Sequence, residues 1–384
     1  MHPFQWRIVA GLTVLLLAGC SNVGYYAQSV KGHWDVLRRA QPIPLLLADP
    51  ATPEPLRQRL EQALAIREFA SRELALPDNG SYRSYAALDR PYVVWSVFAT
   101  PELSLQLKEW CFPVAGCVGY RGYYAQAEAE AFAARLKAQG YDVLVRGVPA
   151  YSTLGWFDDP LLSTVIRYPE TEIARLIFHE LAHQVVYVKD DSVFNESFAS
   201  AVEREGMRRW LEAHGSDAMR AAYATTRARQ EEFVRLVLDY RERLDRVYRS
   251  GASDAEKRAQ KQRLLGELGQ AYRRLKERWG GFSGDGHWFD GELNNAHLAS
   301  VAAYTRFVPA FEALLAREGG DLPRFYAAVK ALARQDKASR LAALEAVAGQ
   351  AVRPAAALAG GRERESPGAD HGSGSGSKAA DFYR

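Results

Sequence analysis

Two histidines four residues apart, with a glutamate between them, constrain this sequence more than any other feature. The segment reads His179-Glu-Leu-Ala-His183, and apolar residues recur at helical spacing on both sides of it. This periodicity predicts an amphipathic α-helix. Residues four apart lie above one another on one helical face, so both imidazoles can direct a nitrogen at one ion. Glu180 falls beside them, close enough to act on a water molecule at that ion.

A pattern this short also occurs by chance in helices that bind no metal. Its surroundings favour a metal site. The two variable positions of the pattern His-Glu-x-x-His are occupied by the uncharged residues Leu181 and Ala182. A half-buried apolar helix is a costly place for two imidazoles unless a partner satisfies them. Thr171 is the expected N-cap of this helix, with Glu172 in its first turn, which places His179 about two turns inside.

A hydrolytic zinc site commonly has three protein ligands and a water, so the pattern requires one more ligand. Glu196 lies thirteen positions after His183, in Asn-Glu-Ser-Phe-Ala, on the next predicted helix. Glu203 lies two turns further on, about 10 Å along the axis, so both carboxylates cannot bind one ion. We expect Glu196 to complete the shell of a single Zn²⁺ ion. Glu203 is then placed to orient one histidine, with a surface ion pair to an arginine as its alternative role.

These motifs resemble the gluzincins, a group of zincin metallopeptidases that includes thermolysin and aminopeptidase N. More closely, His-Glu-Leu-Ala-His-Gln followed by Asn-Glu-Ser-Phe-Ala resembles the zinc aminopeptidase lipoprotein family of proteobacteria, over most of the chain. The resemblance implies zinc-dependent peptide hydrolysis, with Glu180 taking a proton from the zinc-bound water. Ser200 replaces the acidic residue of thermolysin, and the Gly-x-Met-Glu-Asn segment of aminopeptidase N is missing. Aminopeptidase and endopeptidase specificity therefore both stay open.

Two further roles are not fixed by spacing. Related enzymes stabilise the oxyanion with a tyrosine or histidine, and Tyr304 is the candidate here, with core packing as its alternative. An aminopeptidase must also hold the substrate's ammonium group, and Asp158, Asp159 and Glu170 lie upstream of the metal helix. The segment 148–160 occupies the position of the gluzincin edge strand, which pairs with an extended peptide substrate.

The first nineteen residues read as a lipoprotein signal peptide. Arg7 precedes an apolar run from Ile8 to Leu17 that is too short to span a bilayer. Leu-Ala-Gly-Cys20 matches a lipobox, so we expect cleavage before Cys20 and acylation of that residue; ordinary cleavage with a free thiol is the alternative. Ser21 follows, and the enterobacterial sorting pattern then implies the bacterial outer membrane, with the protein facing the periplasm.

Cys111 and Cys117 are the only other cysteines. An exported chain meets an oxidising compartment, and two cysteines that bracket a loop with Pro and Gly are placed to pair. Two free thiols are the alternative. We expect a disulfide that pins a turn near the site.

We predict an α+β fold of the zincin type that is predominantly helical. Before the metal helices, three stretches have helical periodicity: 24–40, 55–76 and 123–139. Two other stretches, 92–98 and 142–148, have the residue pattern of β-strands and are expected to form a small sheet. After the metal helices, apolar residues at alternating spacings of four and three predict a long antiparallel helical hairpin over about 217–279, with a capping box at Ser253 and Glu256.

The zinc metallopeptidase domain would span residues 20–352, and the Pro-, Gly- and Ser-rich segment 353–384 is predicted to be disordered. A net charge of +3 gives no reason to expect nucleic acid as a partner. The charged hairpin is most simply solvated, but it is also a candidate surface for a protein partner. A non-catalytic zinc lipoprotein acting as an envelope scaffold is therefore the alternative to an enzyme. Glu180 favours the enzyme, because a structural site has no use for a base there.

Overall fold

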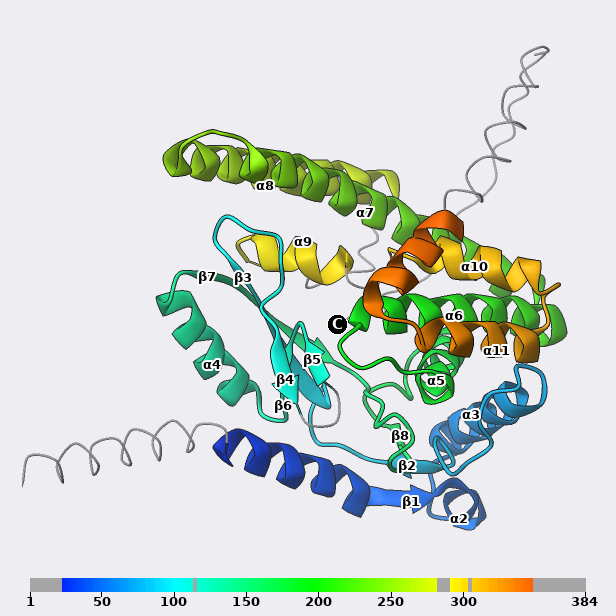
Figure 1. Ribbon diagram of the computed structural model, residues 1–384. Helices are drawn as coiled ribbons and strands as arrows, with labels where there is room; N and C mark the ends of the chain where they lie inside the picture. The colour runs from blue at the N-terminus through cyan, green and yellow to red at the C-terminus, as the bar shows by residue number, and fades with distance from the viewer. Residues whose placement is uncertain (1–22, 113–115, 282–290, 303–305, 348–384) are drawn as a thin grey trace, which may run out of the picture.

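The computed structural model describes residues 23–112, 116–281, 291–302 and 306–347. The lipobox at Cys20, the candidate Tyr304 and the predicted tail at 353–384 lie outside these residues. The fold is α+β and predominantly helical, with only small sheets, so this part of the expected class is confirmed (Figure 1).

The chain enters the fold through a helix over residues 23–39. This helix continues into β1 (Ala40–Pro42), α2 (Ile43–Ala48) and α3 (Glu54–Arg72). A three-stranded sheet joins β1 to β2 (Ser84–Ala86) in antiparallel fashion, and β2 to β8 (Leu161–Leu162) in parallel. This sheet therefore connects the start of the chain to the segment just before the metal helices.

A second sheet has β3 (Val94–Pro101) between β6 (Arg121–Tyr123) and β7 (Tyr141–Val148), all antiparallel. Alternation along β3 sends Trp95 and Val97 to the face covered by α4 (Gln126–Ala138). Phe98 points the opposite way, against Ala296 of α9 (Asn295–Ala302). The sheet is thus covered by a helix on each face (Figure 1).

The predicted disulfide is confirmed. Cys111 of β4 (Trp110–Phe112) and Cys117 of β5 (Gly116–Val118) lie directly opposite each other and are bonded. The β4–β5 hairpin packs on the turn between the two metal helices, because the Cys117 amide donates to Asp190 Oδ1 at 2.6 Å. The cross-link therefore fixes a hairpin that touches the site.

The metal motifs occupy α5 (Glu170–Val185) and α6 (Ser192–His214), which pack along each other. Apolar residues of α5 such as Ile177 and Leu181 are fully buried in the main core, which also holds α3 and α6. The expected cap at Thr171 is wrong. The N-cap is Pro169, two residues earlier, the helix begins at Glu170, and no side chain caps it.

The predicted helical hairpin is present as α7 (Asp217–Arg249) and α8 (Asp254–Arg278). Apolar residues of both helices interlock in a separate core, and the capping box of Ser253 and Glu256 is formed. Lys261 of α8 ties the hairpin to the second sheet through Asp142, at 2.6 Å. Two further helices, α10 (Val308–Arg317) and α11 (Leu322–Ala333), contribute to the main core, and α10 packs against α6 (Figure 1).

Candidate metal centre

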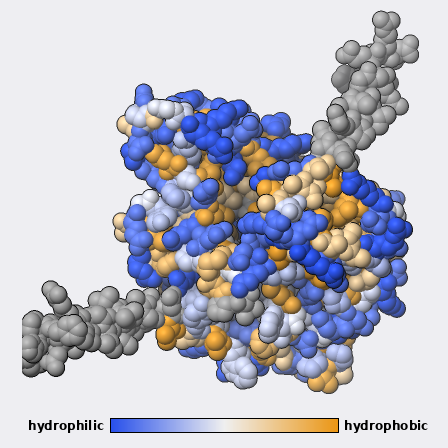
Figure 2. All heavy atoms as spheres, in the orientation of Figure 1, coloured by the Kyte–Doolittle hydropathy of each residue, from blue (hydrophilic) through white to orange (hydrophobic). Residues whose placement is uncertain are grey.

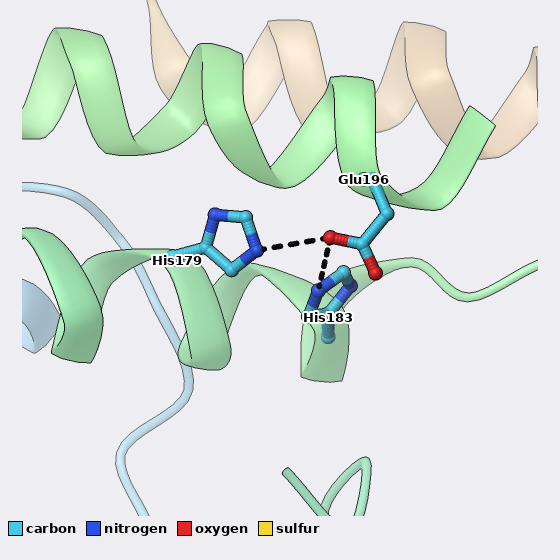
Figure 3. Close-up of side chains that lie close together, drawn as sticks. All are labelled: His179, His183 and Glu196. Atoms are coloured by element: carbon cyan, nitrogen blue, oxygen red, sulfur yellow. Dashed lines mark hydrogen bonds and ion pairs between the residues drawn. The ribbon is translucent and has the colours of Figure 1, made fainter. Parts of the chain in front are cut away.

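Ligand atoms of His179, His183 and Glu196 all lie within 4.8 Å of one another. The two imidazoles come from successive turns of α5, and the carboxylate comes from the first turns of α6 (Figure 3). Glu196 Oε2 is 3.3 Å from His179 Nε2 and 3.8 Å from His183 Nε2. The structure therefore brings together the three residues that the spacing selected as metal ligands.

The turn between the helices explains why Glu196 reaches the histidines. Asn195 binds the backbone of Val188 twice, accepting from its amide at 2.7 Å and donating to its carbonyl at 2.8 Å. Asp191 caps α6 by accepting from Phe194. These contacts fold the chain back at once, so the first turns of α6 lie beside the last turns of α5.

Glu203 lies behind His179 and is almost buried. Its Oε2 is 3.0 Å from His179 Nδ1, and its Oε1 accepts from Arg175 at 3.1 Å. Glu203 therefore contacts a histidine as expected, and its pair with Arg175 is formed by a buried carboxylate and is not the surface ion pair considered as the alternative. An Nδ1–H held by a carboxylate directs the opposite nitrogen, Nε2, toward Glu196 and His183.

His183 has no such support. Its Nδ1 is buried and has no hydrogen-bond partner among the described residues. Burial lowers the pKa of His183 to about 4, so its imidazole is neutral and can donate a lone pair. Burial also acts to lower the pKa of His179, but hydrogen bonds to Glu196 and Glu203 outweigh it and raise that pKa to about 10. Glu196 and Glu203 thus each contact one nitrogen of the His179 ring, and together they favour a positive charge there.

Two imidazoles and a carboxylate, arranged in this way, form a donor set typical of catalytic zinc. Nitrogen and carboxylate ligands on two rigid helices suit that ion better than calcium or magnesium, which prefer oxygen ligands alone. The residues present therefore fit a zinc ion.

Glu180 is half-buried on α5, next to the three candidate ligands. Burial raises its pKa to about 7, and the charges of Glu196 and Asp159 add to that effect, whereas His179 opposes it. A carboxylate with a pKa near neutrality can both accept and return a proton at physiological pH.

Tyr120 is a site residue that the sequence did not reveal. It follows the disulfide hairpin, and its ring lies 5.7 Å from that of Phe98, centroid to centroid. Burial raises the pKa of Tyr120, and the charges of Glu196 and Glu180 act on the hydroxyl and raise the pKa further, so the hydroxyl stays protonated. No local motif marks this residue; only the docking of the hairpin on Asp190 brings it near the site.

Of the three carboxylates considered for the substrate ammonium group, only Asp159 lies near Glu180. Glu170 is at the far end of α5 and accepts from Trp210 at 3.1 Å, while Asp158 is exposed. Asp159 is 3% exposed and accepts from the Thr153 amide at 2.8 Å. Among the described residues, no cationic side chain forms an ion pair with it.

The loop that contains Tyr82 meets Asp159 beside the metal helix. Gln184, one turn after Glu180 on the same face, accepts from Asn79 at 2.7 Å and donates to Ser81 at 3.1 Å. The Tyr82 amide then donates to the Asp159 carbonyl at 2.7 Å. Tyr82 has a φ of 63°, which is strained for a bulky residue, and its buried hydroxyl has no partner among the described residues.

The expected edge strand over 148–160 is wrong. β7 ends at Val148, and residues 149–160 form a loop with turns. Leu154 and Gly155 have φ values of 59° and 81°, which interrupt an extended backbone, and Pro149 and Pro160 cannot donate to a strand partner. The loop instead lies against Gln184 and supplies Asp159 to the site.

Fold and site together define the class of protein: a helical α+β protein with a His-His-Glu group on two packed helices that could bind a metal ion. The family model described as "Putative aminopeptidase" matches residues 24–344, most of the chain, and the chain belongs to this family. No curated protein and no solved structure matches the chain. Membership indicates a peptidase, whose substrates are peptides.

Proposed function

We propose that this protein is a zinc-dependent aminopeptidase of the gluzincin type, with a zincin-type domain over residues 20–352. The observation that carries the proposal is the convergence of His179, His183 and Glu196 beside a half-buried Glu180. The family description supports peptide hydrolysis in general. Zinc dependence is supported by the donor set.

A bound zinc ion would lower the pKa of water and polarise the scissile carbonyl group. Glu180 accepts a proton from the attacking water and passes it to the leaving amine, as its pKa of about 7 allows. Glu203 keeps the His179 ring oriented through Nδ1. Tyr120, rather than Tyr304, is the proposed hydrogen-bond donor to the oxyanion, because the charges of Glu196 and Glu180 act on its hydroxyl, which stays protonated.

Aminopeptidase specificity needs a carboxylate for the substrate's free ammonium group. Asp159 fits this role, since it is buried beside Glu180 and no cationic side chain pairs with it among the described residues. A buried carboxylate without a counter-charge is costly unless a ligand supplies that charge. The unpartnered hydroxyl of Tyr82 adds a polar group at the same place.

Asp159→Asn is expected to lower kcat/KM for peptides with a free N-terminus by about 10- to 100-fold, the scale of a charged hydrogen bond. Hydrolysis of the same peptides with an acetylated N-terminus is expected to be slow in the wild type and little changed in the variant. Asp158→Asn, one residue away and exposed, is the matched control and should behave as wild type. If the wild type cleaves free and acetylated peptides equally well, the endopeptidase alternative is correct instead.

We also propose that the chain is a bacterial lipoprotein, acylated at Cys20 and held on the periplasmic face of the outer membrane. The support is the lipobox in the sequence. Within the described residues, no helix is both long and apolar enough to cross a membrane. The processing of Cys20→Ser in cells tests the anchor, since removal of residues 1–19 from that variant at the normal rate would contradict it.

A further inference from the structure

The helix over residues 23–39 presents an apolar stripe to solvent. Val23, Val30 and Trp34 are 67%, 70% and 67% exposed. Their spacing of seven and four residues places them on one helical face. Among the described residues, eight large hydrophobic side chains are exposed, and seven lie on this helix, on α2 or in the loop over 149–160. Scattered surface hydrophobic residues need no explanation, but a cluster of this kind does.

The opposite face of the helix is fixed to the protein, so the stripe cannot turn inward. Val36 is 1% exposed in the main core. The ring of Tyr25 stacks on Phe112 at 5.6 Å between centroids, and Gly32 leaves no room for a Cβ against the Tyr124 ring. The exposed stripe is therefore a permanent feature of this surface.

The loop over 149–160 extends the stripe. Trp156 and Phe157 are 70% and 51% exposed. His33, on the same helix as the stripe, lies 4.8 Å from the Phe157 ring between centroids, which joins loop and helix into one surface. Leu45 of α2, the helix that comes after β1 in the chain, is also exposed, at 66%. In Figure 2, separate orange patches lie along the lower edge of the molecule, where Figure 1 places this helix and α2. We call Val23, Val30, Trp34, Leu45, Trp156 and Phe157 the apolar edge.

The start of the chain indicates what covers the apolar edge. The described part of this helix starts at Val23, three positions after Cys20, so an acyl anchor at Cys20 would hold the helix at the lipid surface. Lys31 is exposed on the same helix, which suits anionic headgroups, whereas the exposed Arg38 pairs with Asp35 at 2.7 Å. Tryptophan is enriched at membrane interfaces because its ring is apolar and its N–H is polar.

We propose that the apolar edge rests on the surface of a phospholipid bilayer, with Trp34 and Trp156 in the headgroup region. The contact adds a second, protein-based attachment to the proposed acyl anchor. It also holds the loop that carries Asp159 at the bilayer surface. The candidate site would then act on peptides that reach that surface.

The test uses the mature chain, residues 20–384, carrying Cys20→Ser so that no acyl group contributes. Sedimentation with vesicles of phosphatidylethanolamine and phosphatidylglycerol is expected to carry down the protein. Adding Val30→Ser and Trp34→Ser should lower the partition coefficient by about tenfold or more, because both apolar side chains leave the interface. Leu341→Ser, at an exposed apolar residue outside the apolar edge, is the matched control and should bind as before.

Circular dichroism spectra of all variants check folding independently of peptidase activity, so a failure of the proposed enzyme function does not affect the result. The proposal is overturned if the chain with Cys20→Ser does not bind vesicles, or if Val30→Ser and Trp34→Ser leave binding unchanged. It is also overturned if size-exclusion chromatography shows that these substitutions dissociate a dimer of a chain that does not bind vesicles. In that case the apolar edge is a contact between two copies.

Discussion

Glu180→Gln is expected to reduce peptide hydrolysis by about 10²-fold or more, the scale of a lost general base. The amide keeps the size of the side chain but cannot accept the proton of the attacking water. His179, His183 and Glu196 are unchanged, so the zinc content of the purified variant should equal that of the wild type. The two measurements are the turnover number on a peptide substrate and zinc per chain by elemental analysis.

Tyr120→Phe separates the oxyanion role from the role of the base. Loss of an oxyanion donor should lower kcat by about 10²-fold with zinc retained. Tyr304→Phe, the candidate from the sequence, is the companion variant and should stay close to wild type. The opposite ranking would return the oxyanion role to Tyr304.

Undiminished hydrolysis by Glu180→Gln would mean that the reaction takes place at another site.

Glu196→Ala is expected to strip zinc from the protein, whereas Glu203→Ala should weaken zinc binding by at most about 10- to 100-fold. Glu196 is the only carboxylate in the group whose ligand atoms converge, among the described residues. Glu203 contacts His179 at Nδ1, on the side of the ring away from that group, and is also held by Arg175. Its loss frees one histidine to rotate but leaves all three ligands in place.

Glu205→Ala is the matched control on the same helix, because Glu205 pairs with Arg208 and Arg209 outside the site. Its zinc content should equal that of the wild type. If Glu203→Ala loses zinc and Glu196→Ala retains it, the assignment of the third ligand is reversed.

Local patterns in the sequence were sufficient for the metal helices. The spacing of His179 and His183 fixes one helical face, and Glu196 follows after a turn too short to place it elsewhere. The hairpin of α7 and α8 was also predictable, because its apolar spacing and the capping box at Ser253 are properties of single helices.

The surroundings of the metal helices depend on contacts between distant segments. The sequence patterns did not predict these contacts, and in one segment they predicted the wrong structure. Tyr120 reaches the site through the disulfide hairpin and its bond to Asp190. Tyr82 is positioned by Arg67, a buried guanidinium that donates to the carbonyls of Pro77 and Ser81. The loop over 149–160 was predicted as a strand by analogy, but its proline residues and positive φ angles favour turns. Such contacts have no periodic signal along the chain.

The envelope scaffold remains the competing hypothesis, and it differs from the enzyme in one respect: it binds zinc without hydrolysing peptides. The zinc dependence of the peptidase rate therefore tests the central claim most directly. Chelation of the purified mature chain should reduce hydrolysis of a peptide with a free N-terminus to background. Returning about one zinc ion per chain should restore the original rate. A rate that is the same in the zinc-free and zinc-loaded protein would contradict the assignment of His179, His183 and Glu196 as the catalytic metal centre.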